Sequence, residues 1–511
     1  MRRLVEYRWW VLVGVVLCLA GLAPGLQTAL NVDNSLSVWF LEEDPKVEAY
    51  QQFQESFGND EVILVHVREP EGVFTGEALG RMVEATGAFE AVDGVARTYS
   101  VVSAERAEKP TSLTPLTDMA EGELEVEVEP LVPRPIPDSE EKLAAIRQQA
   151  LAHPLVKGRL VDESAEQAMI IVQMSRLENF DKERGRIVGE VRGVAEHHYG
   201  GRFEMGGVGV LYTAMNALTR QDFGRFIGVG YLLMFVLLGL AFRSWRLVVA
   251  ALAVVAGGTL FALGAMGVAG ARLNMVTVIL RTIIIVLGIA DAVHFPVAYR
   301  KERRDAGSEV SRLEVVARAL KSAGIPCLMT TLTTMASFLA LTSSRMSGVG
   351  QVGTYAAIGI ASALVLSLVA MAIALYSGGD DPVTGDYRVP LVDGFLSVAL
   401  GWVKRRQKVL WAITFIAVAG LGWLATSINV DTYTLGYFPQ DHRVVREHEA
   451  IEGSWGPYMP LEYTIDPAGQ ARYDTAEMLT KTDEFARRAA DHPKIGDAVH
   501  AGQLYQYILT T

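Results

Sequence analysis

Residues 275–304 read MVTVILRTIIIVLGIADAVHFPVAYRKERR, and this stretch sets the class of fold. It begins with an apolar run long enough to cross a bilayer as an α-helix, which takes about 20 residues. Three ionisable side chains interrupt that run, Arg281, Asp291 and His294, and a cluster with four basic residues follows it over 299–304. The pattern predicts a membrane-spanning helix over 275–298 that carries a polar site and ends in the cytoplasm.

Six further segments have a similar length and apolarity, so the chain is predicted to cross the membrane seven times. They are residues 9–26, 226–242, 247–269, 325–341, 352–376 and 409–425. The hydrophobic fraction of 50% and the mean hydropathy of +0.24 agree with a membrane protein. The net charge of −12 argues against a nucleic-acid partner, and the two cysteines lie in apolar stretches without metal-site spacing.

Basic clusters predict the orientation of the spans, because Lys and Arg concentrate in cytoplasmic loops. Clusters lie at residues 2–8, 243–246, 299–304 and 404–408, and all fall on one side if the N-terminus is cytoplasmic. We therefore expect a multi-pass protein of the bacterial inner membrane with its large domains in the periplasm. A cleaved signal peptide is the alternative for the first span, but that span has a counterpart in mid-chain, so we interpret it as an anchor.

The counterpart belongs to an internal repeat with a constant offset. Asn31-Val-Asp33 follows the first span and Asn429-Val-Asp431 follows the seventh, so the offset is 398 (429 − 31 = 398). Such parallel repeats are common in transporters. A complete second copy would need about 796 residues (2 × 398), so we expect a truncated sequence, a natural short form being the alternative.

The repeat divides the chain into predicted domains. The expected boundaries are 1–28 for the first span, 29–222 for a periplasmic domain, 223–377 for five helices including an interfacial helix over 309–321, 378–404 for a cytoplasmic linker, 405–427 for the seventh span and 428–511 for the start of the second periplasmic domain. Residues 29–222 hold 35 acidic and 18 basic residues. Their strand and helix runs alternate as βαβ and βαβ, which predicts a ferredoxin-like α+β domain.

Asp291 is the candidate functional residue. A charge at mid-bilayer costs about 2.5–3.5 kcal/mol on translocon scales, so such residues usually mark a pathway. Asp291 and His294 share one helix face, with Gly288 one turn earlier, which predicts a proton relay. A structural role for Asp291 at the interface is the alternative. For Arg281 we expect a structural role. The pair His197-His198 indicates a solvated helix end rather than a metal site.

The fifth span carries a threonine-rich run, Thr330-Thr-Leu-Thr-Thr334. Threonines in membrane helices usually bond to their own backbone. The functional alternative is that Thr333 and Thr334 supply hydroxyl groups to a cavity around Asp291.

Together these features resemble the resistance–nodulation–division (RND) superfamily of exporters, and most closely its MMPL and Patched-like branch, which includes hopanoid and lipid transporters. The motifs that carry the resemblance are Leu287-Gly-Ile-Ala-Asp-Ala-Val-His294 and the run from Thr330 to Phe338. The resemblance extends over essentially the whole chain.

The resemblance implies proton-driven export of a hydrophobic or lipid-like substrate, with Asp291 taking up the proton. It implies no enzymatic activity, catalytic residue, metal or cofactor. Expected partners are membrane lipids, the substrate, and either further copies of the chain or a periplasmic adaptor. A lipid or sterol sensor built on the same five-helix block is one alternative function, and a SecD/SecF-like accessory to protein export is another.

Overall fold

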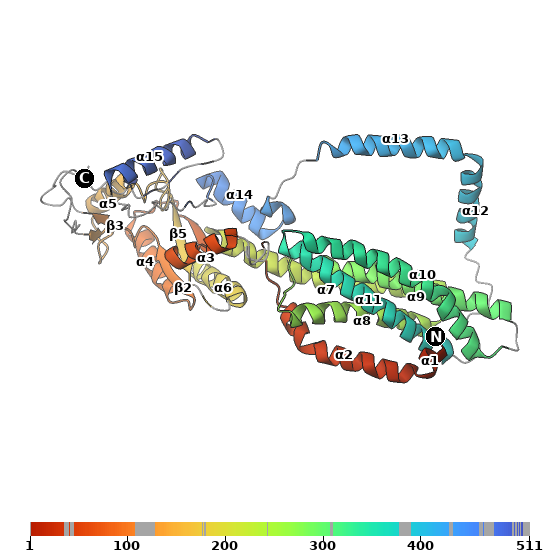
Figure 1. The fold of residues 1–511 in the computed structure, drawn as a ribbon. Coiled ribbons are helices and arrows are strands. Elements are labelled where there is room, and N and C mark those ends of the chain that lie inside the picture. Colours follow the sequence, from red (N-terminus) through yellow and green to blue (C-terminus); the bar gives the residue numbers. More distant parts are fainter. Residues whose placement is uncertain are drawn as a thin grey trace. The chain divides into compact units, whose positions relative to one another are not determined.

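The structure is a computed structural model that divides into two compact units (Figure 1). It describes residues 2–34, 40, 45–107, 128–175, 177, 180–242, 244–306, 310–377, 390–428, 433–458, 463, 475–492, 495, 498, 500 and 502–503. Unit 1 comprises 1–30, 222–344 and 348–437, and unit 2 comprises 31–221, 345–347 and 438–511. The second Asn-Val-Asp motif lies outside the described residues.

Seven helices are long and apolar enough to cross a membrane, which confirms the predicted membrane bundle. They are α2 (Arg8–Ala29), α7 (Val208–Phe242), α8 (Trp245–Val268), α9 (Leu280–Ala306, preceded by η3, Thr277–Ile279), α10 (Arg312–Ala340, followed by η4, Leu341–Ser343), α11 (Ser347–Tyr376) and α13 (Gln407–Ala425). A short helix, α1 (Arg2–Glu6), precedes α2.

Helix α7 begins 15 residues earlier than the expected domain boundary at 223 (223 − 208 = 15). Its first turns belong to unit 2, where they are fixed by buried amide groups. Asn34 Nδ2 donates to Asn216 Oδ1 at 2.8 Å and to Thr219 Oγ1 at 3.3 Å. The helix therefore begins well before its apolar stretch, which apolarity alone does not predict.

Small residues bring the helices of unit 1 together. At Gly25 on α2, an added side chain would collide with the backbone of Gly264 and Val268 on α8, and at Gly267 it would collide with Gly25. Close backbone approach at glycines is a common way for helices to associate in lipid, where burial of apolar side chains supplies little driving force. The pair α2–α8 is therefore held by backbone proximity.

The interfacial helix expected over 309–321 falls on the start of α10, and its place at a membrane surface stays a prediction. Residue 309 lies outside the described residues, and from Arg312 the chain forms the first turns of α10. The apolar stripe of this segment is buried against α9, including Val315, Val316 and Leu320, in contact with a core that contains Phe295. An apolar stripe has the same spacing whether it faces lipid or protein, so the sequence did not distinguish the two.

Unit 2 contains a four-stranded antiparallel sheet in the order β2-β5-β1-β6. The strands are β1 (Val62–Arg68), β2 (Val95–Tyr99), β5 (Gln167–Met174) and β6 (Phe203–Gly206). The main hydrophobic core of unit 2 contains buried apolar residues from the sheet and from helices α4 (Gly76–Glu90) and α6 (Phe180–Tyr199). Outside the sheet lie α3 (Pro45–Phe57), α5 (Glu140–Ala152), α15 (Ala476–Ala490), η5 (Thr434–Tyr437, in unit 1) and the pair β3 (Glu105–Ala107) and β4 (Val128–Pro130).

Helix α14 (Arg443–Trp455) packs on β6 and so joins unit 2. Ile451 is fully buried against Leu64 and Met169 of the sheet. Glu447 accepts hydrogen bonds from both terminal nitrogens of Arg192 at 2.7 and 2.8 Å. The segment expected to begin a separate second domain therefore packs on the first domain, because the sheet presents a partly apolar face to it.

Two buried polar groups lie in β1 and next to it. Glu61 forms a bidentate ion pair with Arg184 of α6 at 2.6 and 2.7 Å. The ring nitrogens of His66 lie 3.0 Å from Glu204 Oε2 and 2.8 Å from Gln167 Oε1. Arg68 pairs with the same Glu204 and offsets its charge. Burial consequently dominates and lowers the pKa of His66.

Candidate functional site

Asp291 lies near the middle of α9 with its side chain turned into the helix bundle, where the residue is 8% exposed. Its surroundings come from the neighbouring helix α10. Thr331 Oγ1 donates a hydrogen bond to Asp291 Oδ2 at 3.3 Å, and the thiol of Cys327 is hydrogen-bonded to the same carboxyl group. Thr331 and Cys327 are both buried and stand one helical turn apart. The site is thus a carboxyl group held by two uncharged donors.

These partners suit a group that changes its protonation state. A hydroxyl group can donate a hydrogen bond or accept one, because its proton rotates. Thr331 can therefore donate to a charged Asp291 and accept from a protonated one without moving its oxygen. Neither state leaves the buried carboxyl group without a partner, which would otherwise cost about 1–3 kcal/mol.

Gly288 precedes Asp291 by one turn and is buried where α9 meets its neighbours. An added side chain there would lie 3.3 Å from Ala363 of α11 and 3.6 Å from Val255 of α8. The glycine therefore lets three helices approach closely on the turn before the carboxyl group. Its role in the structure is packing.

His294 does not share the burial of Asp291. The residue is exposed, and among the described residues no hydrogen bond joins it to the carboxyl group. A spacing of three residues leaves about 60° between two side chains on a helix, which is enough to turn one inward and the other outward. The relay through His294 stays a prediction that this geometry does not assist.

Thr333 is exposed and Thr334 is partly exposed, and the hydroxyl groups of both are bonded to the backbone of their own helix. Thr333 Oγ1 donates to the carbonyl oxygen of Met329 at 3.1 Å, and Thr334 Oγ1 donates to that of Thr330 at 2.7 Å. Thr331 takes the place that the functional alternative gave to them. The signal in the sequence was the pair Cys327 and Thr331, two polar side chains one turn apart, which the run of four threonines obscured.

Arg281 is buried rather than extended toward an interface, with 2% exposure. Its guanidinium donates to the carbonyl oxygen of Phe223 and lies 4.4 Å from the centre of that ring. A cation over an aromatic face is stabilised electrostatically. The structure therefore gives Arg281 a packing role between α9 and α7, in the direction that the sequence favoured.

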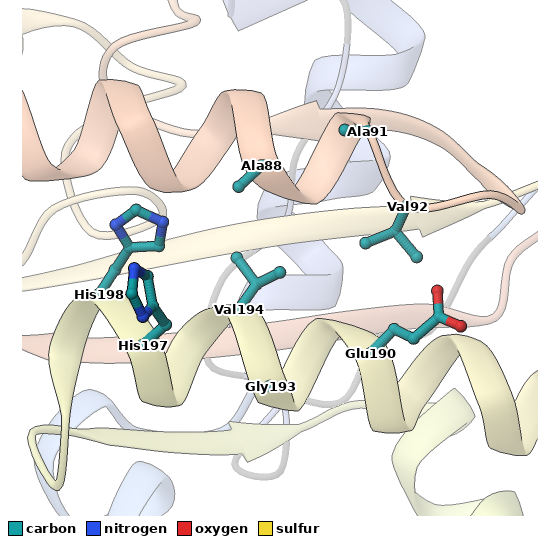
Figure 2. Close-up of a pocket in the computed structure, with 8 residues that line it drawn as sticks. All are labelled: Ala88, Ala91, Val92, Glu190, Gly193, Val194, His197 and His198. Carbon is teal, nitrogen blue, oxygen red and sulfur yellow. The ribbon is translucent and has the colours of Figure 1, made fainter.

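His197 and His198 lie at the end of α6, along a groove of about 460 Å³ between α4 and α6 (Figure 2). The rest of the lining consists of small and apolar residues and one acidic side chain: Ala88, Ala91, Val92, Gly193, Val194 and Glu190. No group of three or more His, Cys, Asp or Glu side chains that could hold a metal ion is found in the described part of the chain. The groove carries no evident chemistry.

Comparison of this chain with known proteins shows the family to which it belongs. Residues 48–406, more than half of the chain, match the MMPL family. The hopanoid transporter HpnN of Burkholderia multivorans (strain ATCC 17616 / 249) is 29% identical over 203 residues. That match covers 39% of this chain and 22% of the relative, so most of the relative's length lies outside it. The family match spans the α/β sheet, the helices that hold Asp291 and the bundle around them, and this chain is therefore a member of the MMPL family.

Proposed function

We propose that this protein is part of an RND-type exporter that moves a hydrophobic, lipid-like substrate and is driven by protons that bind Asp291. Membership of the MMPL family supports transport, and the similarity to a hopanoid transporter supports a lipid-like substrate. The observation that carries the proposal is the buried carboxyl group of Asp291, whose partner Thr331 can serve both of its protonation states.

The coupling would act through the contact between α9 and α10. When Asp291 is charged, Thr331 and Cys327 both orient their donors toward it. When it is protonated, the carboxyl group becomes a donor and the local charge disappears, so the two helices no longer need the same alignment. In the proposed cycle each protonation state of Asp291 favours a different alignment of α9 relative to α10. This change of alignment then moves the two repeats relative to each other.

The proposed protein sits in the bacterial inner membrane with its N-terminus in the cytoplasm and unit 2 in the periplasm. We include in this proposal that unit 2 has a ferredoxin-like fold, which is supported by the strand order β6-β1-β5-β2. The substrate would be taken up at unit 2. The two-copy architecture is supported by α3 and α14, which are both 13 residues long and start at the repeat offset (443 − 45 = 398). Further copies or a periplasmic adaptor would complete the assembly.

The test is transport by the protein in proteoliposomes with an imposed pH gradient. A fluorescent pentacyclic triterpenoid serves as the lipid probe and an enclosed pH-sensitive dye reports protons. We expect Asp291→Asn to abolish gradient-dependent movement of both while membrane insertion is retained.

Thr331→Val and Thr334→Val form a matched pair of threonine variants. Thr331→Val removes the hydrogen bond to the carboxyl group and should slow transport about fivefold, from about 1 kcal/mol for one hydrogen bond. Thr334→Val removes only a bond to the backbone of its own helix and should leave the rate unchanged. Gradient-dependent probe movement that persists in Asp291→Asn would overturn the proposal.

A further inference from the structure

The segment between α11 and α13 contains a helix with an unusual surface, α12 (Pro390–Arg405). The helix meets α13 at the turn between them, and its large apolar side chains are exposed: Phe395 is 73% exposed and Trp402 is 57% exposed. Among the side chains of α12 that the structure describes, the exposed large apolar ones are Phe395, Val398, Leu400, Trp402 and Val403. A cytoplasmic linker was expected here, of which residues 378–389 lie outside the described part.

The exposed apolar side chains of α12 gather on one side. At about 100° per residue, all five fall within a single arc of about 200°. The opposite arc holds Gly394, Ser397, Gly401, Lys404 and Arg405. A strongly amphipathic helix with Phe, Leu and Trp on one side and small or basic residues on the other is typical of a helix that lies in a membrane interface.

A basic elbow, which we define as Lys404, Arg405, Arg406 and Lys408, lies where α12 ends and α13 begins. All four side chains are exposed. The backbone leaves the helical conformation at Arg406, with φ −124° and ψ 29°, so the chain turns there. Lys408 is already in the first turn of α13, a helix long and apolar enough to span the membrane. A membrane-spanning α13 would hold the elbow at the boundary between the bilayer and water.

We propose that α12 lies in the plane of the cytoplasmic leaflet and that the basic elbow binds the headgroups of anionic phospholipids. The start of α13 fixes the depth of the elbow, and the exposed apolar arc of α12 supplies the surface that enters the leaflet. Trp402 lies beside the cations, as is common for aromatic residues at the membrane interface. Clusters of four or more cations next to a membrane span attract anionic lipids, with about fivefold in affinity for each cation.

The position of α12 is tested with nitroxide labels on the full chain in nanodiscs of phosphatidylglycerol and phosphatidylcholine. Phe395→Cys places a label on the apolar arc and Ser397→Cys places a matched label on the polar arc, each with Cys18→Ser. We expect the first label to be accessible to oxygen and the second to a water-soluble nickel chelate. Accessibility of both labels to nickel, or of neither label to either reagent, would overturn the proposal, since the arc would then face water or protein.

The lipid preference is tested by comparing spin-labelled phosphatidylglycerol and phosphatidylcholine at the protein surface. The variant K404Q/R405Q/R406Q/K408Q should lower the preference for phosphatidylglycerol at least about fivefold. The matched control neutralises four other exposed cations expected on the same side of the membrane, Arg246, Lys301, Arg318 and Lys321, and should retain most of the preference. Equal losses in the two variants, or no preference in the native chain, would contradict a site at the elbow. Neither result depends on proton coupling at Asp291.

Discussion

The contacts that hold helix α14 on the sheet of unit 2 include the ion pair of Glu447 with Arg192 and the buried side chain of Ile451, and replacing either should weaken the docking. Glu447→Ala removes two hydrogen bonds from Arg192, at 2.7 and 2.8 Å, in a partly exposed pair. We expect a loss of about 1–2 kcal/mol, below that of a fully buried pair because solvent screens the charges. Ile451→Ala empties a fully buried position and should cost about 3 kcal/mol.

Hydrogen exchange followed by mass spectrometry on the full chain in detergent measures this release directly. The opening equilibrium of α14 should rise roughly 5- to 30-fold in Glu447→Ala and about 150-fold in Ile451→Ala, and exchange of its amides should accelerate in proportion. Glu484→Ala is the control, because its pair with Arg488 on α15 is exposed on both sides and should contribute almost nothing. Unchanged exchange in Ile451→Ala would refute the docking of α14 on this sheet.

Three further predictions concern stability. Arg184→Met leaves the carboxylate of Glu61 buried without its ion pair and should destabilise unit 2 by about 3–5 kcal/mol, seen as a lower thermal midpoint. Gly267→Leu should separate α2 from α8 and lower the thermal midpoint in detergent, whereas Gly14→Leu, which meets no neighbouring atom, should not. Because burial lowers the pKa of His66, the unfolded chain takes up a proton near pH 6.5 that the folded chain takes up only at lower pH. The stability of unit 2 should therefore fall as the pH drops below about 6.5, by at most about 1.4 kcal/mol per pH unit, and a His66→Asn variant should lose this dependence.

The spanning helices could be predicted from the sequence because lipid imposes one requirement, about 20 apolar residues in succession. Their ends could not be predicted in the same way. Helix α7 extends to Val208 because buried amide groups in unit 2 stabilise its first turns, and α10 extends back to Arg312 because its stripe packs on protein. Both extensions depend on tertiary contacts that periodicity does not encode.

The candidate site shows the same division. Asp291 was evident as an acid within an apolar run, since a charge there is costly wherever the helix is placed. Its partners depend on which face of α10 meets α9, and that is decided by packing. Thr331 and Cys327 lie on the contacting face, and Thr333 lies about 160° away around the helix from Thr331. Thr334 is only about 60° from Thr331, but its hydroxyl group is bonded to the backbone of its own helix.

The docking of α14 on unit 2 had no signal in the sequence. The 398-residue offset relates α14 to α3 and so suggested a separate second domain. The contact of Glu447 with Arg192 joins residues 255 positions apart, and single-sequence patterns carry no information on such pairs.

The central claim is that Asp291 binds and releases a proton inside the helix bundle. Infrared difference spectroscopy of the native chain and Asp291→Asn in membranes, recorded across a pH titration, tests it most directly. The account predicts one carboxyl C=O band that appears and disappears reversibly with pH, is missing in Asp291→Asn, and shifts in Thr331→Val. Identical difference spectra for the native chain and Asp291→Asn would contradict it.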